Sequence, residues 1–392
     1  MKVIYGNTDC RPEETGFDSG RLEVLDRRLG EMVEKQLIHG AAYCISHKGK
    51  VIACRALGRG SGLGGESLMQ PDTVFGIASI TKVFTAAAVM QLIEDGLTRL
   101  DCPAGDILPQ FRKKPFDRIT LLQLLTHSSG IYPDKGCFDE EVPSQWELIG
   151  EAAKEWDGKG EFDWITPALS VGLRREPGTE WQYSSFCFTL LGEVISRLSG
   201  MSAQEYIEAK ITRPLGMKDT GFTLSRELSG RLFIHDEEEQ EYVDSLLSGE
   251  GQAQGFWAKI PDTAGGLYST VCDLVRFGNA FIGGGRLDGA RILGRKSVEK
   301  MSRVQLSGVP DRCWGAREDN RLYGIGFDIR RTPAFSYSDN TIMHEGAGAS
   351  SLDIDLDEQL CAAWFVPFDK PENGWSAEPL YNVQNIIWSG II

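Results

Sequence analysis

Strand-like patterns occupy both ends of this 392-residue chain, and helical patterns fill the region between them. Near the N-terminus, the runs "AAYCISHK" and "VIACRAL" flank a turn at Gly49-Lys50, which predicts a β-hairpin. From about residue 322, strand patterns return in "LYGIGFDIR", "SSLDIDLD" and "QLCAAWFVPF". We therefore expect an α+β fold, in which an antiparallel sheet is built from both termini, flanked by helices, and interrupted by a mostly helical inserted domain.

Several segments carry helical patterns with recognisable starts. Apolar spacing predicts a helix over residues 18–38, with Asp18 as its N-cap, and a last amphipathic helix from Glu378 to Trp388. In the middle of the chain, "SAQEYIEAKI" opens with a capping box formed by Ser202 and Glu205, and "STVCDLVRFGNAFI" has apolar residues at helical spacing.

The length of the chain fits two domains, or one large domain with an insertion. We expect residues 1–98 and 318–392 to form the sheet domain, and residues 99–317 to form the helical insert. The active site would then lie in the cleft between these two parts.

Charge and composition restrict the possible partners. The net charge of −15, from 41 basic and 56 acidic residues, argues against nucleic acid or an anionic membrane surface. The first residues lack the apolar core of a signal peptide, and the apolar run Val83–Ile93 is shorter than the roughly 18 residues of a membrane span. The nine scattered cysteines show no Cys-x-x-Cys and no zinc spacing. We expect a cytoplasmic protein with reduced thiols and a small-molecule partner.

The segment "TVFGIASITKVFTAAAVM" places Ser79 three residues before Lys82, at the start of a long apolar run. Residues three apart on a helix share a face, so the Lys82 amine can reach the Ser79 hydroxyl. A serine hydroxyl needs a base to become a nucleophile, and burial makes a lysine a base by disfavouring its ammonium form. Ser79 and Lys82 are therefore candidates for nucleophilic catalysis.

The same spacing occurs at Ser297 and Lys300, within the charged segment "GRKSVEKMSR". There a solvated helix face is the better interpretation, so the spacing alone is a weak signal. For Ser79 the competing structural interpretation is a helix-capping serine beside a lysine that extends to solvent.

Two further segments carry polar groups suited to the same chemistry. Tyr183 lies in a polar loop before an apolar helix, where a phenol can share a proton with a lysine. His344 precedes Gly346 in "TIMHEGAGAS", where glycines allow a substrate to approach the backbone. The backbone N–H groups of Ala347 and Ser79 are candidates for an oxyanion hole. A loop-anchoring tyrosine and a buried strand histidine are the competing interpretations.

These segments, in this order, resemble the three motifs of the serine β-lactamase and penicillin-binding-protein superfamily. The motifs are Ser79-x-x-Lys82, Tyr183-x-Ser185 and His344-x-Gly346. Flanking segments such as "LLQLLTHSSGI", "AGGLYSTVCDLVRF" and "YGIGF" are similar to the class C β-lactamase-related branch, which includes esterases and D-aminopeptidases. The resemblance covers about residues 15 to 370.

The resemblance implies a role for each matching residue. Ser79 would be the acylated nucleophile, Lys82 and Tyr183 would share the general-base and general-acid work, and Ala347 would supply the second oxyanion donor. His344 would hold the third-motif position. The family needs no metal and no cofactor.

Three departures from the family pattern restrict the substrate. Ser185 replaces a common asparagine and reaches less far towards a substrate amide. His344 replaces the lysine that binds the carboxylate of a β-lactam, and Glu345 adds a negative charge beside it. These departures favour neutral or cationic esters and amides over β-lactams.

The leading hypothesis is thus a serine hydrolase, either a carboxylesterase or an amidase or peptidase acting on D-residues. The alternatives are a penicillin-recognising module that acylates slowly or not at all, and an acyltransferase of the same fold.

Overall fold

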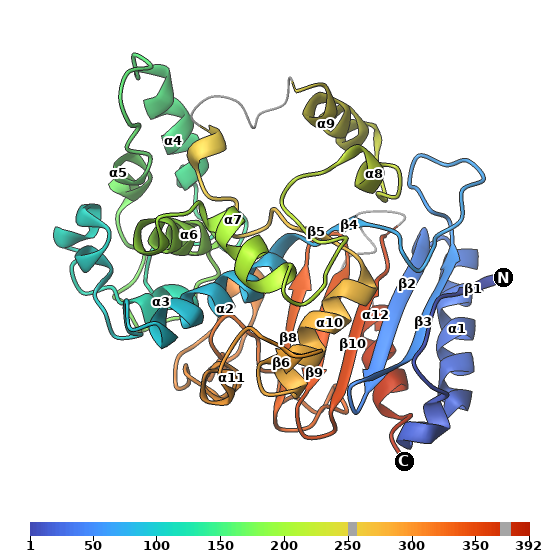
Figure 1. Cartoon of the computed structure of the whole chain (residues 1–392). Coiled ribbons are helices and arrows are strands. Elements are labelled where there is room, and N and C mark those ends of the chain that lie inside the picture. The colour runs from blue at the N-terminus through green and yellow to red at the C-terminus, as the bar shows by residue number, and fades with distance from the viewer. Residues whose placement is uncertain (250–256, 369–377) are drawn as a thin grey trace.

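The sheet expected from the two ends of the chain is present in the computed structural model, which describes residues 1–249, 257–368 and 378–392 (Figure 1). It has six strands, and every neighbouring pair is antiparallel. In spatial order the strands are β1 (Val3–Tyr5), β3 (Lys50–Gly58), β2 (Gly40–His47), β10 (Leu360–Phe365), β9 (Ser350–Asp355) and β8 (Thr341–Gly346). The N-terminal hairpin joins the C-terminal strands where β2 pairs with β10.

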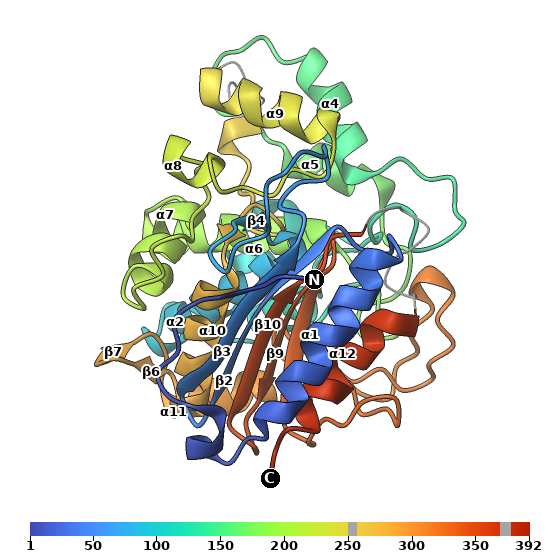
Figure 2. The same cartoon turned by 90° about the vertical axis from the view of Figure 1, so that its right-hand side faces the viewer.

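Helices cover both faces of this sheet. Helices α1 (Ser19–Glu34) and α12 (Glu378–Trp388) lie side by side on one face, and α10 (Val271–Ile282) packs on the other (Figure 2). Alternate residues of β2 point to opposite faces, so Tyr43 belongs to the core beneath α1 while Cys44 belongs to the core beneath α10. Because both faces of the sheet are covered, every residue of β2 is buried.

The remaining helices and strands lie outside the six-stranded sheet (Figure 1). The helices there and around the sheet are α2 (Thr81–Glu94), α3 (Leu121–Leu125), α4 (Gln145–Lys154), α5 (Ile165–Ala168), α6 (Ser185–Ser199), α7 (Ala203–Ile207), α8 (Arg226–Ser229), α9 (Glu237–Ser248) and α11 (Arg295–Ser302). Two short ribbons pair β4 (Phe75–Gly76) with β5 (Tyr268–Ser269), and β6 (Arg286–Leu287) with β7 (Ala290–Arg291).

Several local predictions are confirmed. The side chain of Asp18 accepts a hydrogen bond from the Gly20 N–H at the start of α1. Ser202 and Glu205 form the expected capping box of α7, and α12 spans the predicted residues. All nine cysteines are free thiols, and seven of them are buried.

One predicted strand is wrong. Residues 322–330, "LYGIGFDIR", form isolated bridges at Tyr323 and Asp328 instead of a continuous strand. The cause is a turn at Gly324 to Phe327, in which the Gly324 N–H donates to the Phe327 carbonyl. Gly326 has φ +73°, and an added Cβ there would lie 2.4 Å from the Ala86 Cβ of α2, so the turn packs directly on that helix.

The division into a sheet domain and a helical insert stays a prediction. We refine it by assigning α10 to the sheet part, because this helix packs against β2, β9 and β10. Across the three described ranges, no helix combines the length and the apolarity that a bilayer crossing requires.

Candidate active site

Ser79 lies in a short 3-10 turn, Ala78–Ile80, that connects β4 to α2. The segment before it is held by the β4–β5 ribbon and by a hydrogen bond from the Ile77 N–H to the Leu267 carbonyl. Ala78 has φ +44°, a left-handed backbone conformation that costs a non-glycine residue energy. The surrounding structure therefore holds the backbone before Ser79 in a strained arrangement of the kind found at functional sites.

Lys82, on the first turn of α2, is fully buried and its amine contacts three oxygens. Its Nζ lies 2.9 Å from Ser79 Oγ, 3.2 Å from Ser185 Oγ and 2.9 Å from the carbonyl oxygen of Ala264. The structure thus brings Ser79 and Lys82 together with Ser185, which follows Lys82 by 103 residues.

Asp134 joins this group and was missed in the sequence. Its Oδ1 accepts a hydrogen bond from the Ser185 backbone N–H at 2.6 Å, and its Oδ2 accepts one from the Ser185 hydroxyl at 2.6 Å. The Asp134 N–H in turn donates to the Tyr183 carbonyl. A carboxylate at the N-terminus of α6 is favourable to that helix, but no motif marks this residue, because its partners come together only in the fold.

The hydrogen-bond partners of the Lys82 amine determine where the Ser79 proton can go. The Ala264 carbonyl can only accept, and the Ser185 hydroxyl uses its one hydrogen on Asp134, so both accept from Lys82. A neutral amine has two N–H donors and one lone pair. With both donors used, the lone pair is left for the Ser79 hydroxyl, which then becomes the donor.

Burial changes the proton affinities of the amine and the phenol in opposite directions. It lowers the pKa of Lys82 to about 8, while the nearby carboxylates of Asp134 and Asp262 oppose this shift. Burial raises the pKa of Tyr183 well above its usual value, so Tyr183 remains a phenol at neutral pH. Lys82 is therefore suited to accept a proton and Tyr183 to donate one.

Aromatic rings hold Tyr183 beside the amine. The Lys82 Nζ lies 4.9 Å from the centroid of the Tyr183 ring. The His127 ring stacks on the Tyr183 ring, with centroids 4.4 Å apart and an interplanar angle of 29°. His127 accepts a hydrogen bond from the Ser184 N–H at Nδ1, and Trp314, 60% exposed, packs against the Tyr183 ring from outside. His127 and Trp314 were not predicted as site residues, although His127 lies within the flanking segment "LLQLLTHSSGI".

The third motif ends β8 next to the nucleophile. A Cβ added to Gly346 would lie 2.2 Å from the Ile77 carbonyl oxygen, so only glycine allows β8 to contact the segment before Ser79. Ala347 is exposed in the turn that follows. The pairing of its N–H with that of Ser79 as an oxyanion hole stays a prediction.

His344 is buried and uncharged at neutral pH. Burial and the nearby Lys82 lower its pKa to about 4. Its Nδ1 lies 2.7 Å from the Glu345 carbonyl oxygen, which can only accept, so the proton of the neutral ring is on Nδ1. The remaining ring nitrogen is an acceptor, which offers no attraction to a substrate carboxylate.

The expectation that Glu345 adds an uncompensated negative charge is wrong. Its carboxylate forms a bidentate ion pair with Arg330, with N···O distances of 2.7 and 3.0 Å. Successive strand residues point to opposite faces, so Glu345 and His344 cannot both face the nucleophile. Ser185 was expected to reach less far towards a substrate amide than an asparagine would. In the structure its hydroxyl accepts a hydrogen bond from Lys82 and donates one to Asp134.

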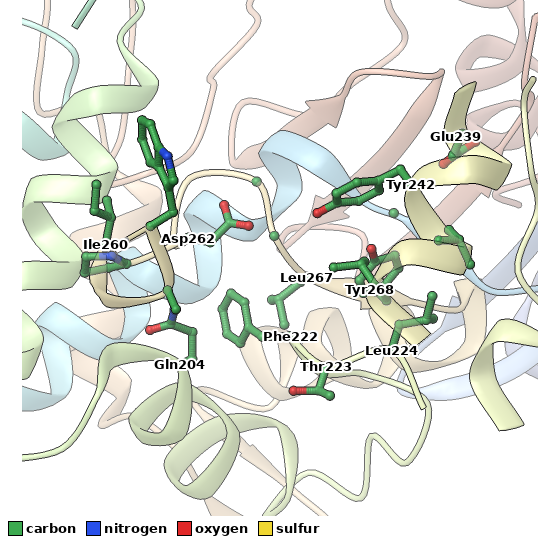
Figure 3. Close-up of a pocket in the computed structure, with 18 of the residues that line it drawn as sticks. Gln204, Phe222, Thr223, Leu224, Glu239, Tyr242, Ile260, Asp262, Leu267 and Tyr268 are labelled. Carbon is green, nitrogen blue, oxygen red and sulfur yellow. The ribbon is translucent and has the colours of Figure 1, made fainter. Parts of the chain in front are cut away.

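A pocket of about 620 Å³ opens beside the nucleophile segment (Figure 3). Its floor includes Gly76 and Gly265, and a Cβ added to Gly265 would lie 3.9 Å from the Ala78 backbone. Aromatic and aliphatic side chains form most of the wall. Asp262 and the Tyr242 hydroxyl point toward each other across it. No lysine or arginine is among the described residues that line the pocket.

The pKa of Lys82 predicts a pH dependence that Asp134 controls. Below about pH 8 the amine is mostly protonated, so we expect kcat/KM for an ester to rise with pH and to level off above that value. In Asp134→Asn the inflection should move to lower pH, because the carboxylate that favours the ammonium form is gone. The plateau should fall about tenfold, because the Asn amide donates to Ser185 and turns its hydroxyl toward the Lys82 lone pair.

Asp139→Asn removes an exposed carboxylate from the same loop and is the matched control. It should keep the wild-type profile. An inflection in Asp134→Asn that stays in place or moves to higher pH would contradict the assignment of the inflection to Lys82.

Comparisons with known proteins agree on a family. A family model described as Beta-lactamase matches residues 25–381. The chain is 29% identical over 294 residues to Esterase EstB of Burkholderia gladioli, covering 68% of this chain and 71% of that protein. It is 31% identical over 220 residues to AmpH of Escherichia coli K12, a D-alanyl-D-alanine-carboxypeptidase/endopeptidase, covering 53% of this chain and 49% of AmpH. The solved structure of EstCE1, a hydrolase with promiscuous acyltransferase activity, has the same fold, with a TM-score of 0.74 at 18% identity over 95% of this chain and 99% of that one.

Proposed function

Because this chain belongs to the Beta-lactamase family, whose model matches residues 25–381, we propose that it is a serine hydrolase acting through an acyl-enzyme on Ser79. Relatives in this family include an esterase and a D-alanyl-D-alanine carboxypeptidase. The observation that carries the proposal is the position of the Lys82 amine, which contacts Ser79 Oγ and two groups that accept its N–H bonds, Ser185 Oγ and the Ala264 carbonyl. In the neutral amine this arrangement leaves the lone pair for the Ser79 hydroxyl.

In the proposed reaction, Ser79 Oγ attacks the substrate carbonyl carbon while its proton moves to the Lys82 amine. The tetrahedral oxyanion is stabilised by the N–H groups of Ser79 and Ala347. Tyr183 donates its proton to the leaving group, and the proton on Lys82 restores the phenol. Water then attacks the acyl-enzyme with the same groups in reverse order, which releases the acid and returns Ser79 to its starting state.

We propose neutral or cationic esters and amides as the substrate class. A neutral His344 offers no positive charge to a substrate carboxylate, and the described pocket lining carries two carboxylates, Glu239 and Asp262, without a lysine or arginine. The aromatic and aliphatic wall suits an apolar acyl or leaving group.

Matched p-nitrophenyl esters with acyl chains ending in a methyl, an ammonium or a carboxylate group test this substrate class, together with D-alanyl p-nitroanilide and nitrocefin. We expect kcat/KM for the carboxylate ester and for nitrocefin to be lower by about tenfold or more, because each lacks one charge-assisted contact. Nitrocefin turnover as fast as that of the methyl ester would make β-lactamase the better description. A stable nitrocefin adduct without turnover of any ester would favour a binding module.

Asp262→Asn should reduce the preference for the ammonium ester over the methyl ester by about five- to tenfold. Burial in the pocket raises the pKa of Asp262, and a bound ammonium group would favour its ionised form. Asp244→Asn on α9 removes the same charge outside the pocket lining and should leave the ratio unchanged. An equal loss in both variants would mean that overall charge, and not Asp262, sets the preference.

A further inference from the structure

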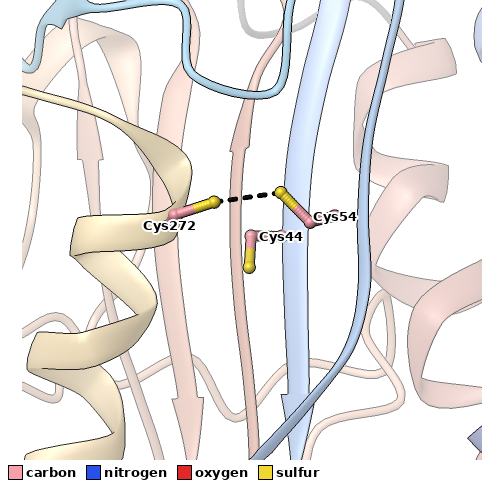
Figure 4. Close-up of side chains that lie close together, drawn as sticks. All are labelled: Cys44, Cys54 and Cys272. Carbon is pink, nitrogen blue, oxygen red and sulfur yellow. Dashed lines mark hydrogen bonds between the residues drawn. The ribbon is translucent and has the colours of Figure 1, made fainter. Parts of the chain in front are cut away.

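Three cysteines meet beneath α10, two from the N-terminal hairpin and one that follows Cys54 by 218 residues (Figure 4). Cys44 on β2 and Cys54 on β3 are directly paired across the hairpin, so their side chains lie on the same face of the sheet. Cys272, the second residue of α10, faces them from above. The three sulfur atoms lie within 4.8 Å of one another, and Cys54 Sγ is 2.9 Å from Cys272 Sγ.

The surroundings of this cysteine cluster are mostly apolar. Cys44 and Cys54 are buried in the core that also contains Met69 and Phe75, whereas Cys272 is partly exposed. The charged group that acts on Cys54 and Cys272 is Asp72, which pairs with Arg231 at the surface. Among the described residues, no histidine or carboxylate completes the cluster as a fourth member.

The helix that covers the cluster suits negatively charged ligands. The N-terminus of α10, a helix of 12 residues, adds a positive end beside Cys272. Cysteine sulfurs are soft ligands, and they bind a metal ion as thiolates.

The geometry points to the metal that these ligands would take. Three sulfurs around one ion, with metal–sulfur bonds of about 2.3 Å, are separated by about 4.0 Å in a trigonal arrangement. The Sγ atoms of Cys54 and Cys272, which are 2.9 Å apart, would have to separate by about 1 Å to reach that arrangement, and all three sulfurs already lie within 4.8 Å of one another. Structural zinc almost always takes four ligands, whereas soft thiolates select Cu(I).

We propose that Cys44, Cys54 and Cys272 form a three-coordinate thiolate site for one Cu(I) ion. Access is from the side of the partly exposed Cys272. Each thiol that becomes a thiolate ligand releases its proton to solvent, and no change of oxidation state occurs. The bound ion would connect the β2–β3 hairpin to α10. This site is separate from the hydrolase chemistry proposed for Ser79.

An anaerobic titration of the full-length reduced protein with Cu(I), supplied as its acetonitrile complex in competition with bathocuproine disulfonate, tests the site. We expect one equivalent to move from the chelator to the protein, and thermal unfolding to occur at higher temperature with copper bound. In Cys54→Ser the affinity should fall about 100-fold or more. Cu(I) that stays with the chelator in the wild-type titration would overturn the proposal.

Cys361→Ser is the matched control. Cys361 on β10 is also buried and its sulfur faces Gly278 of the same helix, but it is not a member of the cluster. It should retain wild-type affinity, and an equal loss in both variants would overturn the proposal. X-ray absorption of the wild-type complex gives a test that needs no variant: three sulfur neighbours support the site, while two sulfurs, or nitrogen and oxygen neighbours, overturn it.

Discussion

Replacing Ser79 with alanine is expected to lower kcat for the best ester substrate by about 10⁴- to 10⁶-fold, the scale seen when a covalent nucleophile is removed. The loss is large because the two other oxygens that the Lys82 amine contacts cannot take the place of the Ser79 hydroxyl. The Ala264 carbonyl has no proton, and the Ser185 proton is donated to Asp134. Stopped or continuous assays with a p-nitrophenyl ester measure the effect.

A covalent probe separates loss of the nucleophile from loss of folding. A fluorophosphonate should add one group to the wild type by intact mass and none to Ser79→Ala, while circular dichroism stays unchanged. Ser297→Ala is the matched control, because Ser297 also precedes a lysine by three residues. An adduct located on Ser297, or an adduct that persists in Ser79→Ala, would remove Ser79 from the proposed role.

The second large effect is expected for Lys82→Ala, which should lower kcat by about 10²- to 10⁴-fold, the usual contribution of a positioned proton-transfer group. The pH profile should also lose its inflection near 8, because that inflection belongs to the Lys82 amine. The loss of the inflection distinguishes a missing base from a general disturbance of the site. The measurement is the rate of ester hydrolysis from pH 5 to 10, a range that includes the titration of the Lys82 amine.

Lys300→Ala supplies the control for this change. Lys300 follows Ser297 with the same spacing on α11, but its side chain is exposed, whereas Lys82 is fully buried. Lys300→Ala should keep wild-type kcat and the wild-type profile. A Lys82→Ala enzyme that retains near wild-type turnover would require a different base and would contradict the proposed proton path.

The comparison of these two serine–lysine pairs explains what the spacing contributes. Both pairs are three residues apart, but Ser297 and Lys300 lie together on α11, whereas Ser79 lies in the 3-10 turn just before α2. Only the pair at Ser79 lies where α2 meets the loop before β5 and the start of α6, and these segments remove water from the amine. Desolvation, which converts a lysine into a base near neutral pH, is thus a property of the tertiary structure.

The same reasoning accounts for the residues that sequence analysis missed or misjudged. Asp134 and His127 contact Ser185 and Tyr183 from a separate loop, and nothing in their immediate sequence indicates those contacts. Glu345 was assigned an effect on substrate charge because it follows His344. Arg330, 15 residues earlier, neutralises it on the opposite face of β8. The sequence shows that a residue is charged, but the effect of that charge on a substrate depends on the ion-pair partners that the fold places beside it.

Three features could be predicted from the residues alone: the sheet built from both termini, the starts of α1 and α7, and the order of the three motifs. Each of these depends on periodicity, capping or spacing within a short segment, where the backbone alone sets which side chains are neighbours. The tertiary structure decided which lysine is buried, which carboxylate meets Ser185, and that Cys44, Cys54 and Cys272 form a cluster across 228 residues of chain. Those features depend on contacts between distant segments, because proton affinity and metal coordination are set by atoms within a few ångströms in space, wherever they lie along the chain.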